Sequence, residues 1–139
     1  IKRMKTVRSF TNVIANLRDV NLRPTRQRIA LAKMLFDGDN RHITAEMLYQ
    51  ETQNTNMRIS LATIYNTLNQ FTSVGLLREI VVDSQRCYFD TNTTDHHHFF
   101  FEKTNELKDI EVGDVVLATV PLAPDGTVIK RIDVVLRVE

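Results

Sequence analysis

The clearest pattern of apolar and polar positions in this sequence lies between Ser60 and Gly75. Its apolar residues are spaced by three, four and three positions: Leu61, Ile64, Leu68 and Phe71. That spacing places them along one face of a helix. Ser60 is a favourable N-cap, and Gly75 is a favourable residue just beyond a helix C-terminus. The pattern therefore predicts a helix that begins after Ser60 and ends before Gly75.

The opposite face of this helix carries no charge. It consists of small, hydroxyl and amide side chains: Ala62, Thr63, Tyr65, Asn66, Asn69 and Gln70. A merely solvated face usually mixes Lys with Glu, whereas methyl, hydroxyl and amide groups match base edges in the DNA major groove. Ala62, Thr63 and Tyr65 suit thymine methyl groups, and Asn66 or Asn69 suits adenine. The alternative is an ordinary amphipathic helix with a polar exterior.

The neighbouring segments predict a winged helix-turn-helix around this helix. Thr25 (or Pro24) and Thr44 stand where helix caps belong, and Met47 and Leu48 are expected to point inward. Helices joined by a polar connector and followed by a strand hairpin are typical of a winged helix. The further helices are expected in residues 1–20, 26–36 and 45–51, and the strands in residues 77–82 and 87–90.

A second, smaller domain is expected after a polar linker. Residues 91–95 contain no apolar side chain, so we place a hinge there between a domain of residues 1–90 and one of residues 96–139. A unit of about 40 residues buries little surface alone, which favours a dimerisation role. The fold class is therefore α+β, with an N-terminal winged helix-turn-helix and a C-terminal small α/β dimerisation domain. Its strands are expected in residues 96–101, 106–112 and 128–138, with residues 114–122 either helix or strand.

Charge divides the chain in two. Residues 1–78 hold 12 Lys and Arg against 5 Asp and Glu, whereas residues 79–139 hold 6 against 12. A basic first half suggests contact with a polyanion. Five arginines of this first half are candidates for contact with DNA phosphates: Arg23, Arg26, Arg28, Arg58 and Arg78. Arg23 could instead enter the minor groove, and Arg86, at the wing, is a further candidate for phosphate contact.

Cysteine count and hydropathy limit the classes of protein. Cys87 is the only cysteine, so neither an internal disulfide nor a structural zinc site with four cysteine ligands can form. No apolar run reaches the roughly 18 residues that span a bilayer, so no membrane partner is expected. The sequence predicts a cytoplasmic protein.

Three consecutive histidines precede three phenylalanines. On a strand, His96 and His98 would face one side and His97 the other. Neutral imidazole binds Fe, Mn and Zn ions as well as haem iron. His42, Asp90 and Glu111 are candidate partners brought near by folding. The alternative is a cluster of polar side chains without a ligand.

The segments NLRPTRQRIAL, RHITAEMLYQE and SLATIYNTLNQFTSVGLL resemble the ferric uptake regulator family, and the likeness continues through RCYFDTN and HHHFFFEK. The resemblance implies a cytoplasmic homodimeric DNA-binding regulator with effector sites at the domain hinge. Tyr65 matches a family residue that contacts bases, Arg23 matches a basic residue of the minor groove, and Asn66 replaces a common Arg.

The family's hinge metal ligands fall on His42, Asp90, His97 and, with a one-residue shift, Glu111. His98 replaces an Asp, Phe99 replaces a frequent His, and the Cys-x-x-Cys pair is absent. This HHHF pattern resembles the iron response regulator branch, a group that senses haem through its histidines, here His96, His97 and His98. The Cys-Pro haem motif of some members is missing, because Tyr88 follows Cys87.

The function predicted from the sequence is a dimeric transcriptional regulator of iron or haem homeostasis and not an enzyme. It would read a roughly palindromic, AT-rich operator in double-stranded DNA. The DNA-binding residues would be Arg23, Thr25, Arg26, Arg28, Arg58, Ser60, Ala62, Thr63, Tyr65 and Asn66. One alternative is regulation by Fe, Mn or Zn without haem. Remoter ones are a metal-dependent hydrolase, for which no HExxH motif is present, and an interaction module with a vestigial helix-turn-helix.

Overall fold

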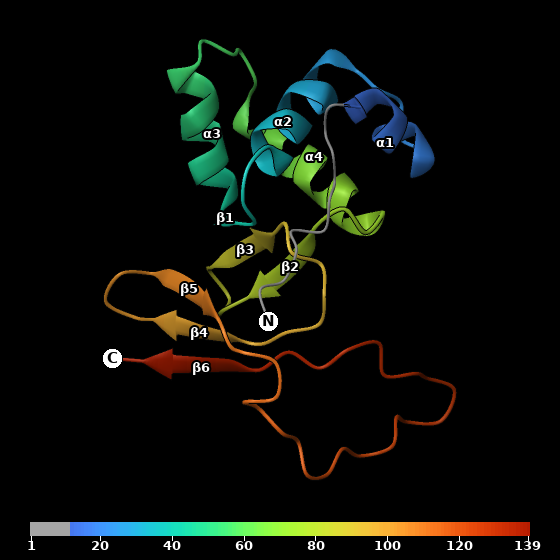
Figure 1. Cartoon of the computed structure of the whole chain (residues 1–139), viewed down its shortest axis with the longest axis vertical. Coiled ribbons are helices and arrows are strands. Elements are labelled where there is room, and N and C mark those ends of the chain that lie inside the picture. The colour runs from blue at the N-terminus through green and yellow to red at the C-terminus, as the bar shows by residue number, and fades with distance from the viewer. Residues whose placement is uncertain (1–11) are drawn as a thin grey trace. The chain divides into compact units, whose positions relative to one another are not determined.

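The computed structural model describes residues 12–139 and divides into two compact units. The first ends at Thr93 and the second comprises Thr94–Glu139 (Figure 1). Of the helix predicted in residues 1–20, the structure describes α1 (Val13–Asp19), and residues 1–11 lie outside the described part. Within the described residues, none of the helices combines the length and the apolar character needed to cross a bilayer.

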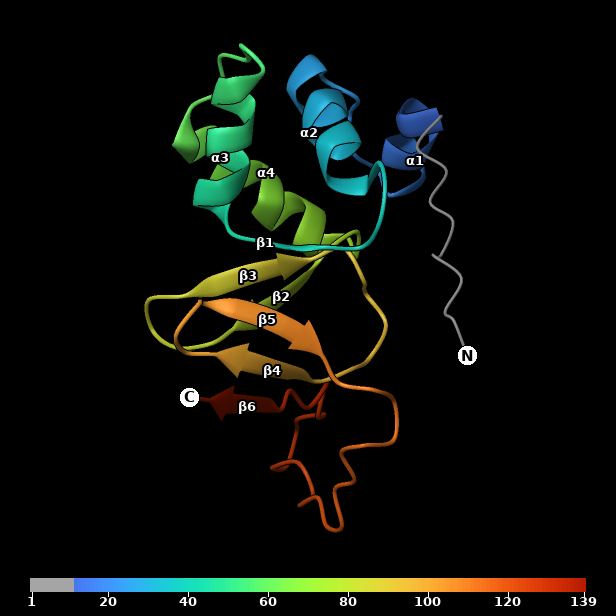
Figure 2. The same ribbon diagram turned by 60° about the vertical axis from the view of Figure 1, so that its left-hand side comes forward.

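The N-terminal unit is a winged helix, as the sequence predicts. Its helices lie to one side of a three-stranded sheet (Figure 2). Helix α3 packs against α4, and α1 packs against α2. The elements that follow α1 are α2 (Arg26–Phe36), β1 (His42–Ile43), α3 (Ala45–Asn54), α4 (Leu61–Ser73), β2 (Arg78–Val81) and β3 (Cys87–Asp90).

The three long helices begin at the hydroxyl residues that the sequence marks as caps. Thr25, Thr44 and Ser60 each accept a hydrogen bond from the backbone N–H three residues later, at 3.3, 3.1 and 3.1 Å. Each cap satisfies a backbone donor that the helix itself leaves unpaired. The beginnings of these helices are therefore fixed locally by the sequence.

Helix α4 ends in a Schellman motif. Gly75 has φ +85°, and its N–H donates to the Thr72 carbonyl at 3.1 Å. The Leu76 N–H donates to the Phe71 carbonyl at 2.9 Å. Glycine adopts this left-handed conformation without the clash that a Cβ atom causes. The predicted helix between Ser60 and Gly75 is confirmed at both ends.

The core of this unit is built from the predicted apolar faces. Ile64, Leu68 and Phe71 of α4 are fully buried, and Leu48 of α3 is buried with them. The prediction that Met47 points inward is wrong, because its side chain is 45% exposed. Helix α3 also runs three residues beyond the predicted end. Its buried residues Ala45, Leu48 and Thr52 form the face that packs toward α4, and Met47, about 100° from Leu48 around the helix, lies on the outer side. The face of α4 opposite the core is left exposed.

The sheet of the N-terminal unit has the order β1-β3-β2, with both pairs antiparallel. Asp90, on the central strand, is in register with His42 on one neighbour and Arg78 on the other. Arg78 is only 5% exposed, so the prediction that it reaches DNA phosphates is wrong. Its register position places a buried cation beside a buried carboxylate instead.

The C-terminal unit is a three-stranded sheet of order β5-β4-β6, built from β4 (His98–Phe101), β5 (Glu106–Asp109) and β6 (Val135–Val138). Strand β4 pairs antiparallel with β5 and parallel with β6. The strand predicted over residues 128–138 forms only in its last four residues, and residues 114–122 are neither helix nor strand. Several large apolar side chains of this unit are exposed: Val112, Val116, Leu122 and Val128.

Candidate functional site

The outer face of α4 is open to solvent. Tyr65 is 39% exposed, and Ala62, Asn66, Asn69 and Gln70 are also exposed. Thr63 is half-buried, and its hydroxyl accepts a hydrogen bond from the Ser60 hydroxyl at 2.9 Å. The uncharged face recognised in the sequence is therefore available for contact with another molecule.

Tyr65 is tied to helix α3. Its hydroxyl donates a hydrogen bond to Oε2 of Glu46, in the first turn of α3. This hydrogen bond, with smaller contributions from burial and from the charge of Glu46, raises the pKa of the Tyr65 hydroxyl. The phenol therefore stays protonated and keeps one orientation.

Gln70, further along α4, is held by helix α2. Arg28 donates two hydrogen bonds to Oε1 of Gln70, from Nε at 3.3 Å and from Nη2 at 3.0 Å. A third, from Nη1, goes to the Arg23 carbonyl at 2.9 Å. Because guanidinium has five N–H donors, two remain for another acceptor such as a phosphate. Arg28 thus fixes the start of α2 against the exposed face of α4.

A hollow of about 390 Å³ lies beside the hydrogen-bonded pair of Arg28 and Gln70, between the start of α2 and the outer face of α4. Its walls are polar or cationic throughout and include Arg23, Thr25, Thr63 and Asn66. An anionic or hydrogen-bonding ligand suits such walls better than an apolar one. The hollow joins residues predicted from two separate segments of the sequence.

The other predicted phosphate contacts differ in their surroundings. Arg23, Arg26 and Arg58 are exposed. Arg86 is half-buried and pairs with Asp83, whose Oδ2 lies 2.8 Å from Nη2 of Arg86. A guanidinium already paired within its own hairpin is less available to DNA than the exposed arginines.

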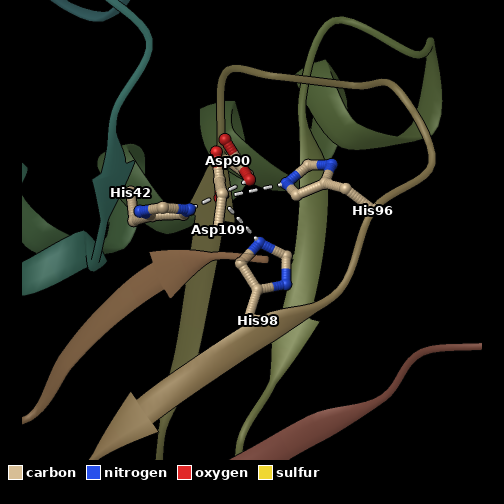
Figure 3. Close-up of side chains that lie close together, drawn as sticks. All are labelled: His42, Asp90, His96, His98 and Asp109. Carbon is tan, nitrogen blue, oxygen red and sulfur yellow. Dashed lines mark ion pairs between the residues drawn. The ribbon is translucent and has the colours of Figure 1, made fainter. Parts of the chain in front are cut away.

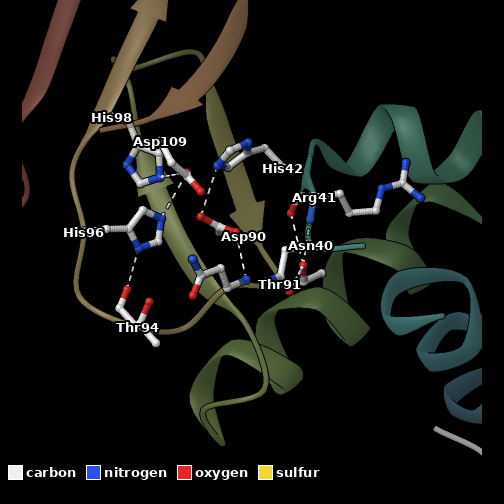
Figure 4. Close-up of polar contacts among 10 residues, drawn as sticks. Asn40, Arg41, His42, Asp90, Thr91, Thr94, His96, His98 and Asp109 are labelled. Atoms are coloured by element: carbon white, nitrogen blue, oxygen red, sulfur yellow. Dashed lines mark hydrogen bonds and ion pairs between the residues drawn. The ribbon is translucent and has the colours of Figure 1, made fainter. Parts of the chain in front are cut away.

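His42 and Asp90 form a pair in the N-terminal unit. Nε2 of His42 lies 3.2 Å from Oδ2 of Asp90 (Figure 3). Asp90 is 1% exposed, and its Oδ1 accepts a hydrogen bond from the Asn92 N–H at 2.8 Å. Both carboxylate oxygens therefore have partners, as a buried charge requires. Thr91 anchors the same strand end by accepting from the Arg41 N–H at 2.8 Å and donating to Asn40 (Figure 4).

A second cluster lies within the C-terminal unit. Nε2 of His96 lies 3.2 Å from Oδ1 of Asp109, and Nε2 of His98 lies 3.3 Å from the same oxygen (Figure 3). The two imidazole rings are 4.4 Å apart, and both are buried. His98 and Asp109 are in register on β4 and β5, and the loop before β4 carries His96 to the same side. Two nitrogens and one carboxylate oxygen therefore converge.

The hydrogen bonding of His96 fixes its tautomer. Nδ1 of His96 lies 2.5 Å from the Thr94 carbonyl oxygen (Figure 4). A carbonyl only accepts, so Nδ1 carries the hydrogen. In the neutral ring Nε2 then presents a lone pair toward the Asp109 carboxylate, an arrangement that needs a proton or a cation between the two atoms. This is the second-sphere pattern by which backbone carbonyls orient metal-binding histidines.

The donor set of this cluster fits a divalent transition metal. The ligand atoms of a tetrahedral site with bonds of 2.0–2.1 Å lie about 3.3 Å apart. The separations of 3.2 and 3.3 Å from Asp109 to the two histidines match that value. Imidazole and carboxylate together suit Zn, Fe or Mn. The ligand atoms of Asp109 and both histidines lie within 4.8 Å of one another, so these residues are candidates to hold such an ion.

His96 and His97 precede β4, so the alternation predicted for a strand does not extend over them, and both line one cavity. Nδ1 of His97 accepts a hydrogen bond from the Val134 N–H at 3.1 Å, so the neutral ring carries its hydrogen on Nε2. In this tautomer the lone pair of His97 Nδ1 accepts the Val134 hydrogen and is not directed at a metal. His97 and Glu111 line a cavity of about 380 Å³ whose walls combine apolar side chains, among them Ile110, Val115 and Ile132, with the polar or charged side chains of Asp95, His96 and Arg131.

Cys87 is placed where it has little reactivity. Burial, and then a hydrogen bond from its thiol to Oε2 of Glu79 at 3.0 Å, raise the pKa of Cys87 to about 12. A thiol with that pKa stays protonated near neutral pH and is a poor nucleophile and a poor metal ligand.

Two important residues do not stand out in the sequence. Asp109 is opposite His98 only because a four-residue turn joins β4 to β5, with Asn105 at φ +58°. The turn segment Glu102–Asn105 carries a signal for this register, since Asn tolerates that conformation. Glu46 gives no comparable signal, because 19 positions separate it from Tyr65.

Comparisons with known proteins agree with this description. A sequence model of the Ferric uptake regulator family matches residues 19–123. The peroxide-responsive repressor PerR of Staphylococcus epidermidis is 36% identical over 96 residues, which are 69% of this chain and 63% of that protein. PerR of Staphylococcus aureus (strain Mu50) is 35% identical over 98 residues, 70% of this chain and 66% of that protein. The match thus spans slightly less than two thirds of the length of either relative.

Solved structures share the fold. The Vibrio cholerae ferric uptake regulator aligns with a TM-score of 0.72 at 20% identity, over 92% of this chain and 99% of that one. The Pseudomonas aeruginosa ferric uptake regulator, solved with manganese, aligns with a TM-score of 0.66 at 23% identity, over 89% and 94%.

Proposed function

Because this chain belongs to the ferric uptake regulator family, we propose that it is a DNA-binding transcriptional regulator that responds to a divalent metal ion. The observation that carries the DNA-binding part is the exposed, uncharged face of α4, flanked by the exposed cations Arg23, Arg26 and Arg58. Uncharged polar groups discriminate base edges, and cations hold phosphates.

In this proposal α4 enters the major groove of an AT-rich operator. Tyr65 and Asn66 contact base edges, and Ala62 and Thr63 contact thymine methyl groups. Thr25 and Ser60, the exposed N-cap residues of α2 and α4, would contact the DNA backbone. Arg28 uses its two remaining N–H donors for a phosphate next to the 390 Å³ hollow.

A dimer would read a roughly palindromic operator, one half-site for each protomer. The exposed apolar side chains of the C-terminal unit support self-association, because Val116, Leu122 and Val128 are each more than 80% exposed. Analytical ultracentrifugation of the wild-type chain tests this directly. A monomer at tens of micromolar would contradict the dimer.

The roles of the DNA-binding residues are tested by comparing operator DNA with random DNA. Tyr65→Ala is expected to lower the preference for operator, by about 1–3 kcal/mol if a specific base contact is lost. Arg26→Ala is expected to weaken binding to both DNAs and to reduce the slope of log affinity against log salt by about one. Equal losses of specificity from both substitutions would count against these roles.

The metal is assigned to the cluster of His96, His98 and Asp109, on the strength of its tautomer and its ligand separations. His42 and Asp90 are proposed as ligands on their own 3.2 Å pairing and on the family resemblance. The resemblance also names His97 and Glu111, which line one cavity. Zn, Fe or Mn would supply a positive charge that neutralises the carboxylates. Titration of Zn²⁺ and Mn²⁺ into the His98→Ala and His97→Ala variants, with elemental analysis, distinguishes the cluster of His96, His98 and Asp109 from the ligands that the resemblance names. The His98→Ala variant is expected to lose the ion, and the His97→Ala variant is expected to keep it.

Haem is the second candidate effector, and the cavity beside His97 favours it. The cavity is lined by the imidazoles of His96 and His97 together with apolar side chains such as Ile110, Val115 and Ile132, and imidazole is a usual axial ligand of haem iron. Ligation by His97 would require release of its hydrogen bond from the Val134 N–H. Haem titration into wild type and His97→Ala, followed by the Soret band, tests this candidate. An identical spectrum in the two proteins would exclude His97 as a haem ligand. The triple variant with His96, His97 and His98 replaced by Ala then tests the three histidines together.

A further inference from the structure

Tyr65 lies at one edge of the exposed face of α4, and its hydroxyl is not free to rotate. A phenol has one hydrogen, and the ionised carboxylate of Glu46 can only accept it. The raised pKa of Tyr65 agrees with a phenol that keeps this hydrogen. What Tyr65 Oη can offer to a further partner is therefore a lone pair.

At the opposite edge of this face, Gln70 presents hydrogen-bond donors, whereas Tyr65 presents an acceptor. At about 100° per residue, Tyr65 and Gln70 lie about 140° apart around α4, with Ala62, Asn66 and Asn69 between them. Arg28 has only donors, so Oε1 of Gln70 must be the atom that faces it. The Gln70 amide therefore presents its N–H groups outward. Partners on α2 and α3 fix the hydrogen-bonding character of both edges.

We propose that Glu46 is a specificity-determining residue, because it makes Tyr65 a reader that accepts and does not donate. In the major groove, adenine N6 and cytosine N4 donate, whereas guanine O6 and N7 and thymine O4 accept. On the strand that Tyr65 contacts, the protein then prefers A or C over G or T at the facing position. This inference rests on the proposed function, since it requires α4 to lie in the major groove.

The competing explanation is that Glu46 only stabilises helix α3. Glu46 is the acidic residue of the first turn of α3, where a negative charge interacts favourably with the helix dipole. That role would make Glu46 matter for stability and leave base preference untouched. The two explanations therefore differ in what removal of Glu46 does to DNA discrimination.

The experiment selects DNA from a randomised duplex library with wild type, Tyr65→Phe, Glu46→Ala and the double variant. The position whose base preference changes in Tyr65→Phe identifies the base pair that faces Tyr65. Wild type is expected to favour A or C there by about fivefold, the usual size of one hydrogen bond. Glu46→Ala is expected to reduce that preference to about twofold or less, because the hydroxyl can then donate as well as accept. The double variant should match Tyr65→Phe alone.

Charge effects are separated by a matched control. Glu46→Ala also removes a negative charge near the phosphates, so affinity for random DNA is expected to rise while discrimination falls. Asp39→Ala removes an exposed carboxylate from the same unit and does not touch Tyr65. It is expected to leave the base preference unchanged. Glu46→Gln keeps the side-chain size but can donate to the phenol, so it should relax the preference as well.

Retention of the full preference by Glu46→Ala, or a wild-type preference for G or T at the position that Tyr65→Phe identifies, overturns the inference. Failure of wild type to enrich any sequence overturns the proposed DNA reading itself and the inference with it. Enrichment of an operator in which Tyr65→Phe changes no position leaves the DNA reading intact and overturns only the role of the Tyr65 hydroxyl.

Discussion

Replacement of Asp109 by Asn gives the sharpest test of the metal cluster. The substitution keeps the size of the side chain and removes the charge that faces Nε2 of both His96 and His98, at 3.2 and 3.3 Å. Residues that merely support metal ligands already contribute about 10- to 100-fold to affinity. A direct carboxylate ligand should contribute at least about 100-fold, so Asp109→Asn is expected to weaken Zn²⁺ binding by that factor or more.

This loss can be read as a change in thermal stability. At a Zn²⁺ concentration of about 100 times the wild-type Kd, the ion stabilises the folded state by about 2.7 kcal/mol. A 100-fold rise in Kd leaves about 0.4 kcal/mol of this stabilisation, so about 2.3 kcal/mol disappears. For a chain of this size that corresponds to about 7 °C in Tm. Calorimetry of wild type and variant, each with Zn²⁺ and with EDTA, measures the difference.

The variant should melt close to wild type in EDTA, because half of the Asp109 side chain is exposed and no metal is then present to bind it. Asp114→Asn provides the control, since it removes an exposed carboxylate from the same unit. The reasoning would be refuted if Asp109→Asn kept the wild-type Zn²⁺-induced rise in Tm, or if Asp114→Asn lost it equally.

Two further predictions concern the end of α4 and the cysteine. Gly75→Ala places a Cβ atom at φ +85° and is expected to destabilise the N-terminal unit by about 1 kcal/mol, measured by urea unfolding; a neutral effect would contradict the strain. Cys87 has a pKa of about 12, so at pH 8 iodoacetamide should modify the folded protein about 1000-fold more slowly than a thiol of pKa 9. Its rate should rise about tenfold per pH unit above pH 9, and Glu79→Gln should accelerate it, because the carboxylate contributes to the raised pKa. A plateau near pH 9 in the folded protein, with urea-unfolded chain as the reference, would show that the pKa is not raised.

The parts of the fold that the sequence predicts well are fixed by local interactions. The caps at Thr25, Thr44 and Ser60 and the left-handed Gly75 act within a few residues of themselves, so their residue types are sufficient evidence. The apolar face of α4 is similarly a matter of spacing along one helix.

The parts that it predicts poorly depend on register or on distant partners. Asp109 reaches His98 through strand pairing, and a shift of one residue would have turned its side chain to the other face. Met47 could not be placed without knowing which face of α3 packs against α4, and Arg78 could not be placed without the sheet. Residues 114–122 have strand-forming side chains but no strand partner within the described unit, so β-propensity alone does not order them.

The distribution of buried polar side chains is consistent with the proposal that residues between Asp90 and His98 bind a metal ion. Of the eight polar or charged residues buried in the described part of the chain, five lie within these nine positions: Asp90, Thr91, Asn92, His96 and His98. Buried polar groups need hydrogen-bond partners to offset their desolvation, and replacing a buried ion pair by apolar residues of similar size is often neutral or stabilising. Local departures from the rules of stable packing are concentrated where side chains are positioned for function. The hydrogen bond to the Thr94 carbonyl places a hydrogen of His96 on Nδ1, and Nε2 of the same ring lies 3.2 Å from the Asp109 carboxylate.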